Sequence, residues 1–192
     1  VGVDWDGDDD IDMISGNTAG YLVFYENLSG PGVEKPRWAA PESLEADGQI
    51  IRPMAGANGS IQGPCEAKWG YTTLNVADWD GDGKRDIVLN SILGDVVWLR
   101  NIGSTTQLAA PQPIEVGWNG AQPTLAWGWR KPQGKALLTQ WRTTPLVHDF
   151  NGDGLPDLAM LDHEGFLAFF ERTRRDGRLM LKQPRRAFCG ED

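Results

Sequence analysis

The sequence predicts an all-β fold built from about three four-stranded antiparallel units, and two observations carry this prediction. An Asp-rich stretch occurs three times, beginning at Asp4, Asp78 and Asp149, so that successive copies start 74 and 71 residues apart. After each copy the same order returns: a short apolar segment, a turn that contains Gly, and a longer segment with aromatic residues. Self-similarity at a long, nearly constant period indicates a chain built from repeated structural units.

Each unit is expected to contribute three consecutive inner strands. The first strand is the apolar approach to the Asp-rich stretch, and the second is the short apolar segment that follows it. The third is the aromatic segment, in which apolar and polar residues alternate or nearly so, as in a half-buried strand. This third strand is predicted at 21–27, 95–101 and 166–172.

The fourth strand is expected at the outer edge of each unit. It follows a turn that contains Gly, at 29–30, 102–103 and 176–177. It is a weaker segment that bears proline, which is tolerated on an edge strand because that strand does not need every backbone N–H. The segments are 36–41, 111–116 and 179–184, and the approximate unit boundaries within the single domain are 1–46, 47–116 and 117–192.

The Asp-rich stretch has the ligand pattern of a calcium loop, because its positions one, three, five and nine all carry oxygen-bearing side chains. Calcium takes about six to eight oxygen ligands, and alternate residues of a tight turn can aim their side chains at one point. The seventh residue would add a backbone carbonyl, while Gly81 and Gly152 would adopt the positive φ that the bend needs. The predicted ligands are Asp4, Asp6, Asp8, Asp10 and Asp12 in the first loop, Asp78, Asp80, Asp82, Lys84 and Asp86 in the second, and Asp149, Asn151, Asp153, Leu155 and Asp157 in the third.

Other interpretations of this stretch fit less well. An EF-hand needs an acidic residue at position twelve and a helix on each side, but position twelve holds Ser15, Leu89 and Met160. Magnesium prefers a rigid octahedron that keeps waters. Asp, Asn and Gly also form polar turns without any metal, yet three copies in one frame favour up to three calcium ions, one per repeat. Asn151 leaves the third site one charge weaker.

A four-stranded antiparallel unit whose first strand leads into such a loop is typical of a β-propeller blade. The pattern Asp-x-Asp-Gly-Asp-Gly-x-x-Asp, nearly verbatim at 78–86 and 149–157, resembles the hallmark of the FG-GAP/VCBS repeat family. The resemblance covers most of the chain. Three blades do not close a ring of about four to eight, so the chain is expected to be a segment of a larger propeller, for which the resemblance suggests seven blades. The remaining blades of the parent chain would then cover its open edges, which are otherwise an aggregation hazard.

The charge and apolar content of the chain indicate which kinds of partner it does not favour. The net charge is −9, but eleven of the 27 acidic residues occupy positions one, three, five and nine of the three loops, which leaves 16 acids against 18 bases elsewhere. This balance gives no support for nucleic-acid binding, and no apolar run approaches the length of a membrane span. Millimolar calcium outside the cell suits loop sites, so an extracellular or periplasmic location is expected. The chain opens at Val1 inside a motif, so a preceding segment is expected, and pairing of Cys65 with Cys189 stays open.

Strand parity places ligand-binding loops at the end of the units opposite the calcium loops. Two of the loops at that end are long, 45–70 and 117–140, and long loops in a compact repeat are more often functional than idle. Tryptophan faces suit sugar rings, although aromatic residues also pack between sheets. The predicted substrate-binding residues are Trp69, Trp127, Trp129, Trp141 and Asn90, and the predicted catalytic residues are Tyr71, Arg142 and His163.

Three functional hypotheses follow. The first is a uronate polysaccharide lyase acting by β-elimination, in which Arg142 neutralises the uronate carboxylate and Tyr71 or His163 transfers protons; the resemblance to repeats of polysaccharide-degrading bacteria suggests it. The second is a non-catalytic propeller that binds glycan or protein, as integrin-type relatives of the repeat do in adhesion. The third is a scaffold whose active site lies in other blades. No nucleophile elbow, phosphate loop or zinc motif is present.

Overall fold

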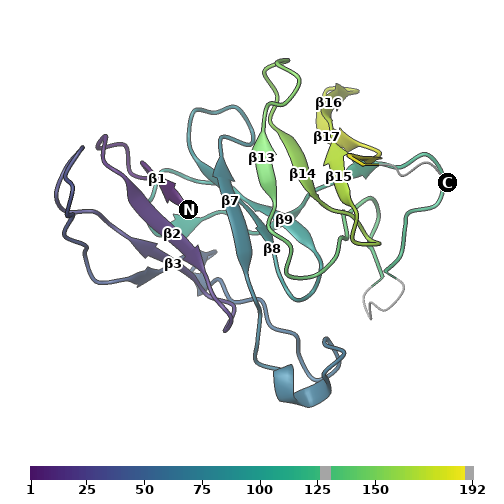
Figure 1. The fold of residues 1–192 in the computed structure, drawn as a ribbon, viewed down its shortest axis with the longest axis horizontal. Helices are drawn as coiled ribbons and strands as arrows, with labels where there is room; N and C mark the ends of the chain where they lie inside the picture. Colours follow the sequence, from purple (N-terminus) through teal and green to yellow (C-terminus); the bar gives the residue numbers. More distant parts are fainter. Residues whose placement is uncertain (126–130, 189–192) are drawn as a thin grey trace.

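The protein is described here by a computed structural model that covers residues 1–125 and 131–188. Three four-stranded antiparallel sheets stand side by side along the molecule (Figure 1). The all-β prediction is confirmed, and the three sheets fall inside the three predicted units. Among the described residues the helical structure is one short 3-10 helix, η1 (Gly63–Glu66), and no helix is long and apolar enough to cross a membrane.

The strands of each sheet follow the chain, since each strand pairs with the next by an antiparallel ladder. The first sheet contains β1 (Gly2–Val3), β2 (Asp12–Gly16), β3 (Leu22–Tyr25) and β4 (Glu42–Ser43). The second contains β7 (Thr73–Ala77), β8 (Asp86–Asn90), β9 (Val96–Leu99) and β11 (Gln112–Pro113). The third contains β13 (Leu146–His148), β14 (Asp157–Leu161), β15 (Leu167–Phe170) and β18 (Arg185–Arg186).

The Asp-rich loops join the first strand to the second strand of each sheet, as expected. In Figure 1 the loop between β13 and β14 lies at the top of the view and the helix η1 lies at the bottom. The two predicted functional regions, the Asp-rich loops and the long loop that contains η1, therefore occupy opposite ends of the sheets.

Two predictions of a fourth strand need correction. The segment 36–41 precedes β4 and contributes only a bridge between Trp38 and Asn27. The segment 179–184 lies largely in β17 (Arg178–Lys182), which pairs with β16 (Arg172–Arg175) instead of β15. The reason is the turn at Asp176 and Gly177, whose φ values of 50° and 77° close a tight two-residue hairpin. The chain returns to the third sheet only afterwards, as β18.

Short parallel ladders connect each sheet to the next, and the sequence did not predict them. The strand β5 (Glu45–Ala46), which forms a hairpin with β6 (Gln49–Ile50), pairs in parallel with β10 (Gln107–Leu108). One repeat later, β12 (Val116–Gly117) pairs in parallel with β17. In both cases the chain that leaves one sheet pairs with the segment that follows the third strand of the next sheet. These repeated ladders join successive units.

The core consists of two apolar layers, one on each face of the middle sheet. Ile87 and Leu89 of β8 pack toward the first sheet, and Val88, between them, packs toward the third. All five residues of β8 are buried, which is expected for a strand covered on both faces. Full burial of each such aliphatic side chain stabilises the fold by about 1.5–3 kcal/mol.

The outer faces of the two end sheets are much more exposed. Trp5 and Trp79, at position two of the first and second loops, are 5% and 4% exposed because the following sheet covers them. Phe150 holds the same position in the third loop and is 46% exposed. Leu167 of β15 and Met13 of β2 are also exposed, whereas their counterparts in the middle sheet, Val96 and Ile87, are fully buried. Among the described residues, each end sheet therefore lacks a cover on one apolar face.

Candidate functional site

The ninth residue of each Asp-rich loop anchors the loop from inside. Its carboxylate is buried and both oxygens accept backbone N–H groups. One N–H comes from loop position two, at 3.1 Å each time, and the other comes from the residue two positions beyond the third strand, at 3.0, 2.8 and 2.7 Å. The three sets are Asp12 with Trp5 and Asn27, Asp86 with Trp79 and Asn101, and Asp157 with Phe150 and Arg172.

This anchoring role was not anticipated from the sequence, which assigned the ninth residue to metal binding alone. A carboxylate oxygen has a second lone pair after accepting one hydrogen bond, so a ligand role for the ninth residue stays a prediction. The exact repetition of both hydrogen bonds shows that the three loops share one conformation at their two ends.

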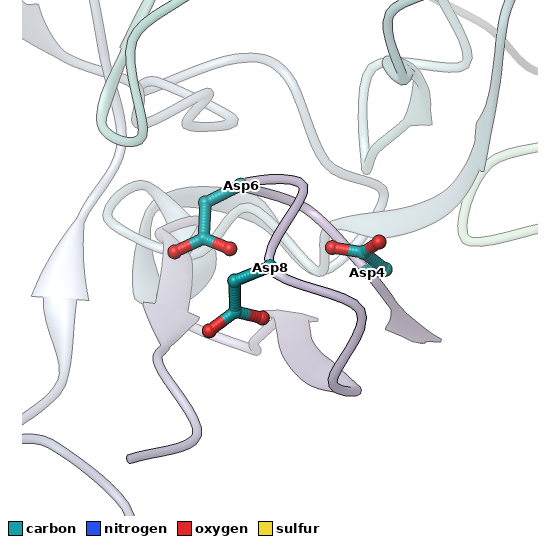
Figure 2. A group of neighbouring side chains, drawn as sticks. All are labelled: Asp4, Asp6 and Asp8. Atoms are coloured by element: carbon teal, nitrogen blue, oxygen red, sulfur yellow. The ribbon is translucent and has the colours of Figure 1, made fainter. Parts of the chain in front are cut away.

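The carboxylates at positions one, three and five converge in the first two loops. One oxygen from each of Asp4, Asp6 and Asp8 lies within 4.8 Å of the others, and Asp78, Asp80 and Asp82 form a matching group. Figure 2 shows the first group on its loop, with the carboxylate of Asp4 turned toward those of Asp6 and Asp8. These are hard oxygen donors gathered around one point, which is the set that calcium prefers.

The turns within the loops behave as predicted. Gly81 and Gly152, at position four, have φ values of 79° and 76°, and their N–H groups donate to the position-one carboxylates of Asp78 and Asp149 at 2.8 and 2.7 Å. In the first loop a non-glycine residue, Asp9, adopts a φ of 70° at position six. Asp tolerates this left-handed region better than most side chains.

The first loop concentrates negative charge. Burial raises the pKa of Asp6, and the neighbouring carboxylates of Asp12, Asp8 and Glu26 raise it further. Asp10 is 1% exposed; its Oδ2 accepts the N–H of Gly30 at 3.1 Å, whereas its Oδ1 has no hydrogen-bond partner. Burial and the adjacent carboxylates of Asp8 and Asp12 raise the pKa of Asp10 as well. A buried carboxylate oxygen without a partner is costly, and a bound cation would remove that cost.

The second loop carries its own cations. Arg100 reaches Asp80 through Nε at 2.7 Å and Asp82 through Nη2 at 2.8 Å, and Lys84 Nζ lies 3.1 Å from Asp82. The backbone N–H of Lys84, together with the Lys84 and Arg100 side chains, lowers the pKa of Asp82 to about 2. The sequence analysis did not identify Arg100, although it stands where the other two units have Glu26 and Glu171.

The third loop has a different internal contact. The Asn151 amide nitrogen donates to Asp153 Oδ2 at 3.1 Å, and the Asn151 Oδ1 accepts the backbone N–H of Asp153 at 2.9 Å. The N–H of Gly154, followed by those of neighbouring residues, lowers the pKa of Asp149. The loop keeps its shape through these hydrogen bonds, with one carboxylate fewer than the others.

At the opposite end, the structure brings Tyr71 and Arg142 together around a buried carboxylate. The Arg142 guanidinium lies 3.7 Å from the centroid of the Tyr71 ring, and its Nη2 is 3.0 Å from Glu66 Oε2. The Tyr71 hydroxyl donates to Glu66 Oε1 at 2.8 Å, and Ser60 also donates to Glu66, which is 5% exposed. We call Ser60, Glu66, Tyr71 and Arg142 the Glu66 cluster.

Glu66 was not among the residues predicted from the sequence, although its isolation from other acidic residues could have pointed to it. It is the one acidic residue in the segment 48–70, which forms most of the first long loop. Hydrogen bonds from Ser60 and Tyr71 and the charge of Arg142 lower the pKa of Glu66 despite its burial. The hydrogen bond to Glu66 raises the pKa of Tyr71. The cluster is thus an ion pair with a protonated tyrosine.

Tyr71 and Arg142 also share an unusual backbone conformation. Their φ values are 47° and 60°, in the left-handed region that such side chains rarely adopt. The N–H of Tyr71 donates to Thr18 O and the N–H of Arg142 donates to Ser91 O, each at 3.1 Å and each across to the preceding sheet. Such a conformation costs about 1–3 kcal/mol and is often found at functional sites.

Of the remaining predicted residues, some lie beside the Glu66 cluster and others do not. Trp69 is exposed and its ring centroid lies 5.5 Å from that of Tyr71, while the Trp141 ring centroid is 4.8 Å from the Arg142 guanidinium. His163 lies in the turn between β14 and β15, where its carbonyl accepts a hydrogen bond from Gln140, and no described contact joins its side chain to the Glu66 cluster. Trp127 and Trp129 lie outside the described residues.

Asn90 has a structural position. It is fully buried at the end of β8, where its amide nitrogen donates to Thr139 Oγ1 at 3.0 Å and its Oδ1 accepts the N–H of Thr143 at 3.2 Å. These contacts tie the second sheet to the start of the third. The side chain predicted to contact substrate therefore lies beneath the surface.

Comparison of the chain with protein-family models, with curated proteins and with solved structures finds no match in any of the three. The functional assignment therefore depends on the geometry described above.

Proposed function

We propose that the chain is a calcium-binding segment of a β-propeller of the FG-GAP/VCBS type, acting outside the cell and binding polysaccharide through the loops opposite the calcium sites. The observation that carries the metal assignment is the first loop. There, the carboxylates of Asp4, Asp6 and Asp8 converge, and the same loop holds a buried Asp10 oxygen that has no hydrogen-bond partner.

The residues of the first loop fit calcium by donor type. Asp4, Asp6 and Asp8 offer converging carboxylate oxygens, and Asp10, at position seven, would add its backbone carbonyl. When bound, the ion would supply charge neutralisation and fix the loop, while the protein's hydrogen bonds to Asp12 hold both ends of that loop. Sites with many charged ligands bind calcium more tightly.

The propeller assignment is supported by the way the sheets cover each other. The middle sheet is buried on both faces. Both parallel ladders also join the segment that leaves one sheet to the segment that follows the third strand of the next sheet. Phe150 and Leu167 on the third sheet, and Met13 on the first, correspond to residues that a neighbouring sheet covers in the middle unit. Further blades of the parent chain would bury these apolar faces.

The Glu66 cluster favours binding over catalysis. Arg142 is already paired with Glu66, so its charge is not free to neutralise a uronate carboxylate. The hydrogen bond to Glu66 raises the pKa of Tyr71, which leaves a smaller fraction of the tyrosine deprotonated and able to act as a base near neutral pH. Exposed Trp69 beside Tyr71 instead offers an aromatic surface of the kind that stacks on sugar rings. The lyase hypothesis is retained as the alternative, because Tyr71 and Arg142 do lie together.

Calcium binding is tested by calorimetric titration and by thermal unfolding with and without chelator. The parent protein is expected to bind calcium and to lose stability in chelator, by about 2.7 kcal/mol where free calcium was a hundredfold above the Kd. The variant Asp4→Asn/Asp6→Asn/Asp8→Asn should lose the part of that effect that the first loop contributes, whereas Asp47→Asn, an exposed turn residue, should keep the whole effect. An unchanged melting curve for the parent in chelator, with no heat of binding, would refute the assignment.

Polysaccharide binding is tested by affinity electrophoresis on a panel of acidic and neutral glycans, together with the ultraviolet absorbance of unsaturated uronate products. Retention by a glycan without product formation, weakened by Trp69→Ala, supports the proposal. Product formation that Tyr71→Phe abolishes would establish the lyase instead. Neither retention nor product on any glycan would refute both.

A further inference from the structure

We propose that Arg100 is a tethered counter-cation of the second loop, so that the first loop takes up a divalent cation at lower concentrations than the second does. This inference deepens the calcium assignment and rests on it. It concerns which of the three loops binds calcium most tightly. The Asp residues that the loops share do not answer this question.

Two cations of the chain already contact the carboxylates of the second loop. The Arg100 guanidinium spans Asp80 and Asp82, which hold positions three and five of the metal frame, at 2.7 and 2.8 Å. Lys84 adds a second cation on Asp82 at 3.1 Å. Charge-assisted hydrogen bonds of this length are strong. A metal ion that binds Asp80 and Asp82 must therefore displace a cation that is already attached to the chain.

The residue at the position of Arg100 has the opposite charge in the first unit. Arg100 directly precedes Asn101, whose N–H donates to the ninth residue of its loop, Asp86. In the first unit the residue before the corresponding Asn27 is Glu26. The negative charge of Glu26 acts on Asp6, at position three of the first loop. One structural position thus holds a cation beside one loop and an anion beside the other.

The third unit shows a third arrangement at this position. Glu171 occupies it, but Lys182 and Arg185 from β17 and β18 pair with that carboxylate. The side chain is thereby neutralised from outside the loop. The third loop keeps two carboxylates and one amide at positions one, three and five, so it serves here as an intermediate case.

The residue at position seven also differs in charge between the loops. Asp10 stands at position seven, where the second loop has Lys84 and the third has Leu155. Its Oδ1 is buried without a hydrogen-bond partner, and Asp8, at position five, interacts with the same carboxylate. The first loop therefore has an additional acidic residue at the position where the second loop has a cation. Because calcium affinity follows the number of charged ligands, the two loops should differ by about tenfold or more.

The test compares the second loop with and without Arg100 after the first loop has been disabled. In the variant Asp6→Asn/Asp8→Asn the first loop is disabled, and the second loop is then titrated with calcium in the presence and absence of Arg100→Glu, which installs the residue found in the other two units. Arg100→Glu should strengthen binding by about tenfold or more. Arg100→Gln should strengthen it less, and Arg178→Glu, an exposed charge reversal on the β16–β17 hairpin, is the matched control and should leave it unchanged.

Terbium luminescence excited through tryptophan gives a second measurement. Trp5 and Trp79 stand at position two of the first and second loops, whereas the third loop has Phe150, so sensitised emission reports on the first two loops. Parent emission should rise in a tight phase that Asp6→Asn/Asp8→Asn removes, and Arg100→Glu should add a second tight phase. Circular dichroism confirms that each variant is folded.

The outcomes separate this inference from the calcium assignment. Equal affinities of the two loops in the parent, or an Arg100→Glu variant that binds no more tightly than the Arg178→Glu control, would overturn the inference while leaving calcium binding in place. A parent protein that binds neither calcium nor terbium would overturn both.

Discussion

Glu66 is the buried carboxylate that holds together the loops at the end opposite the Asp-rich loops. It accepts hydrogen bonds from Ser60 and Tyr71 and pairs with Arg142, 76 residues further along the chain. These contacts attach the segment 48–70 to the start of the third unit. They also hold the two left-handed residues, Tyr71 and Arg142, against each other.

Replacement of Glu66 by Gln should lower the melting temperature near neutral pH, because Arg142 loses its charged partner. The pKa of Glu66 is lowered from its ordinary 4.5 in the folded protein. Its charge therefore contributes stability above that value, and the contribution disappears as the pH falls through the folded pKa. The difference in melting temperature between parent and Glu66→Gln should shrink over the same interval.

Thermal unfolding followed by circular dichroism between about pH 7 and pH 3 measures this difference. Glu34→Gln, at an exposed site, is the control and should track the parent at every pH. A difference that stays constant as the pH falls would show that the Glu66 charge does not stabilise the fold.

Asp86 illustrates a second single-residue effect. Both of its oxygens accept buried backbone N–H groups, from Trp79 and Asn101. Asp86→Asn would place an amide N–H against one of these donors, so the variant should unfold about 1–3 kcal/mol more easily in denaturant even without metal. Asp47→Asn provides the matched control. If the two variants were equally stable in chelator, the anchoring role of Asp86 would be wrong.

At the scale of elements, β8 is buried along its whole length, with apolar neighbours on both faces. Ile87 is fully buried between the first and second sheets. Ile87→Ala should cost about 2–5 kcal/mol in free energy of unfolding, since it removes buried methyl and methylene groups and leaves a cavity.

Ile11 is the control for that substitution, because it has the same side chain but is exposed. Ile11→Ala should change stability by no more than about 0.5 kcal/mol. Chemical denaturation of the two variants checks the difference, and similar losses for both would contradict the packing of β8 between two sheets.

Some strands could be predicted from the sequence and others could not. The strands after each Asp-rich loop were predictable, because alternation and the loop itself are encoded within about ten neighbouring residues. The place of β17 was not, because two continuations were compatible with the same apolar and proline pattern. The hairpin at Asp176 and Gly177 and the parallel partner β12 decided between them.

At the scale of the whole molecule, the two end sheets determine how the chain behaves alone. Phe150, Leu167 and Met13 leave apolar faces uncovered among the described residues. Such faces favour association with other chains. The isolated chain should therefore self-associate with rising concentration in sedimentation velocity experiments.

Leu167→Glu places a charge on the third sheet's exposed face and should shift the chain toward monomer by about tenfold in concentration. Thr124→Glu adds the same charge at an exposed site elsewhere and should leave association unchanged. A parent chain that sediments as a monomer at every concentration would contradict the expected role of these faces.

The sequence by itself determined the repeat, the three sheets and the frame of oxygen donors in each loop, because turns, alternation and ligand spacing depend on residues close together in the chain. Tertiary structure alone decided which charges meet. Arg100 reaches Asp80 and Asp82 across the sheet, Glu66 meets Arg142 from 76 residues away, and Asn90 is enclosed by Thr139 and Thr143. The physical reason is that long-range pairing follows from how the sheets stack, which no local pattern specifies.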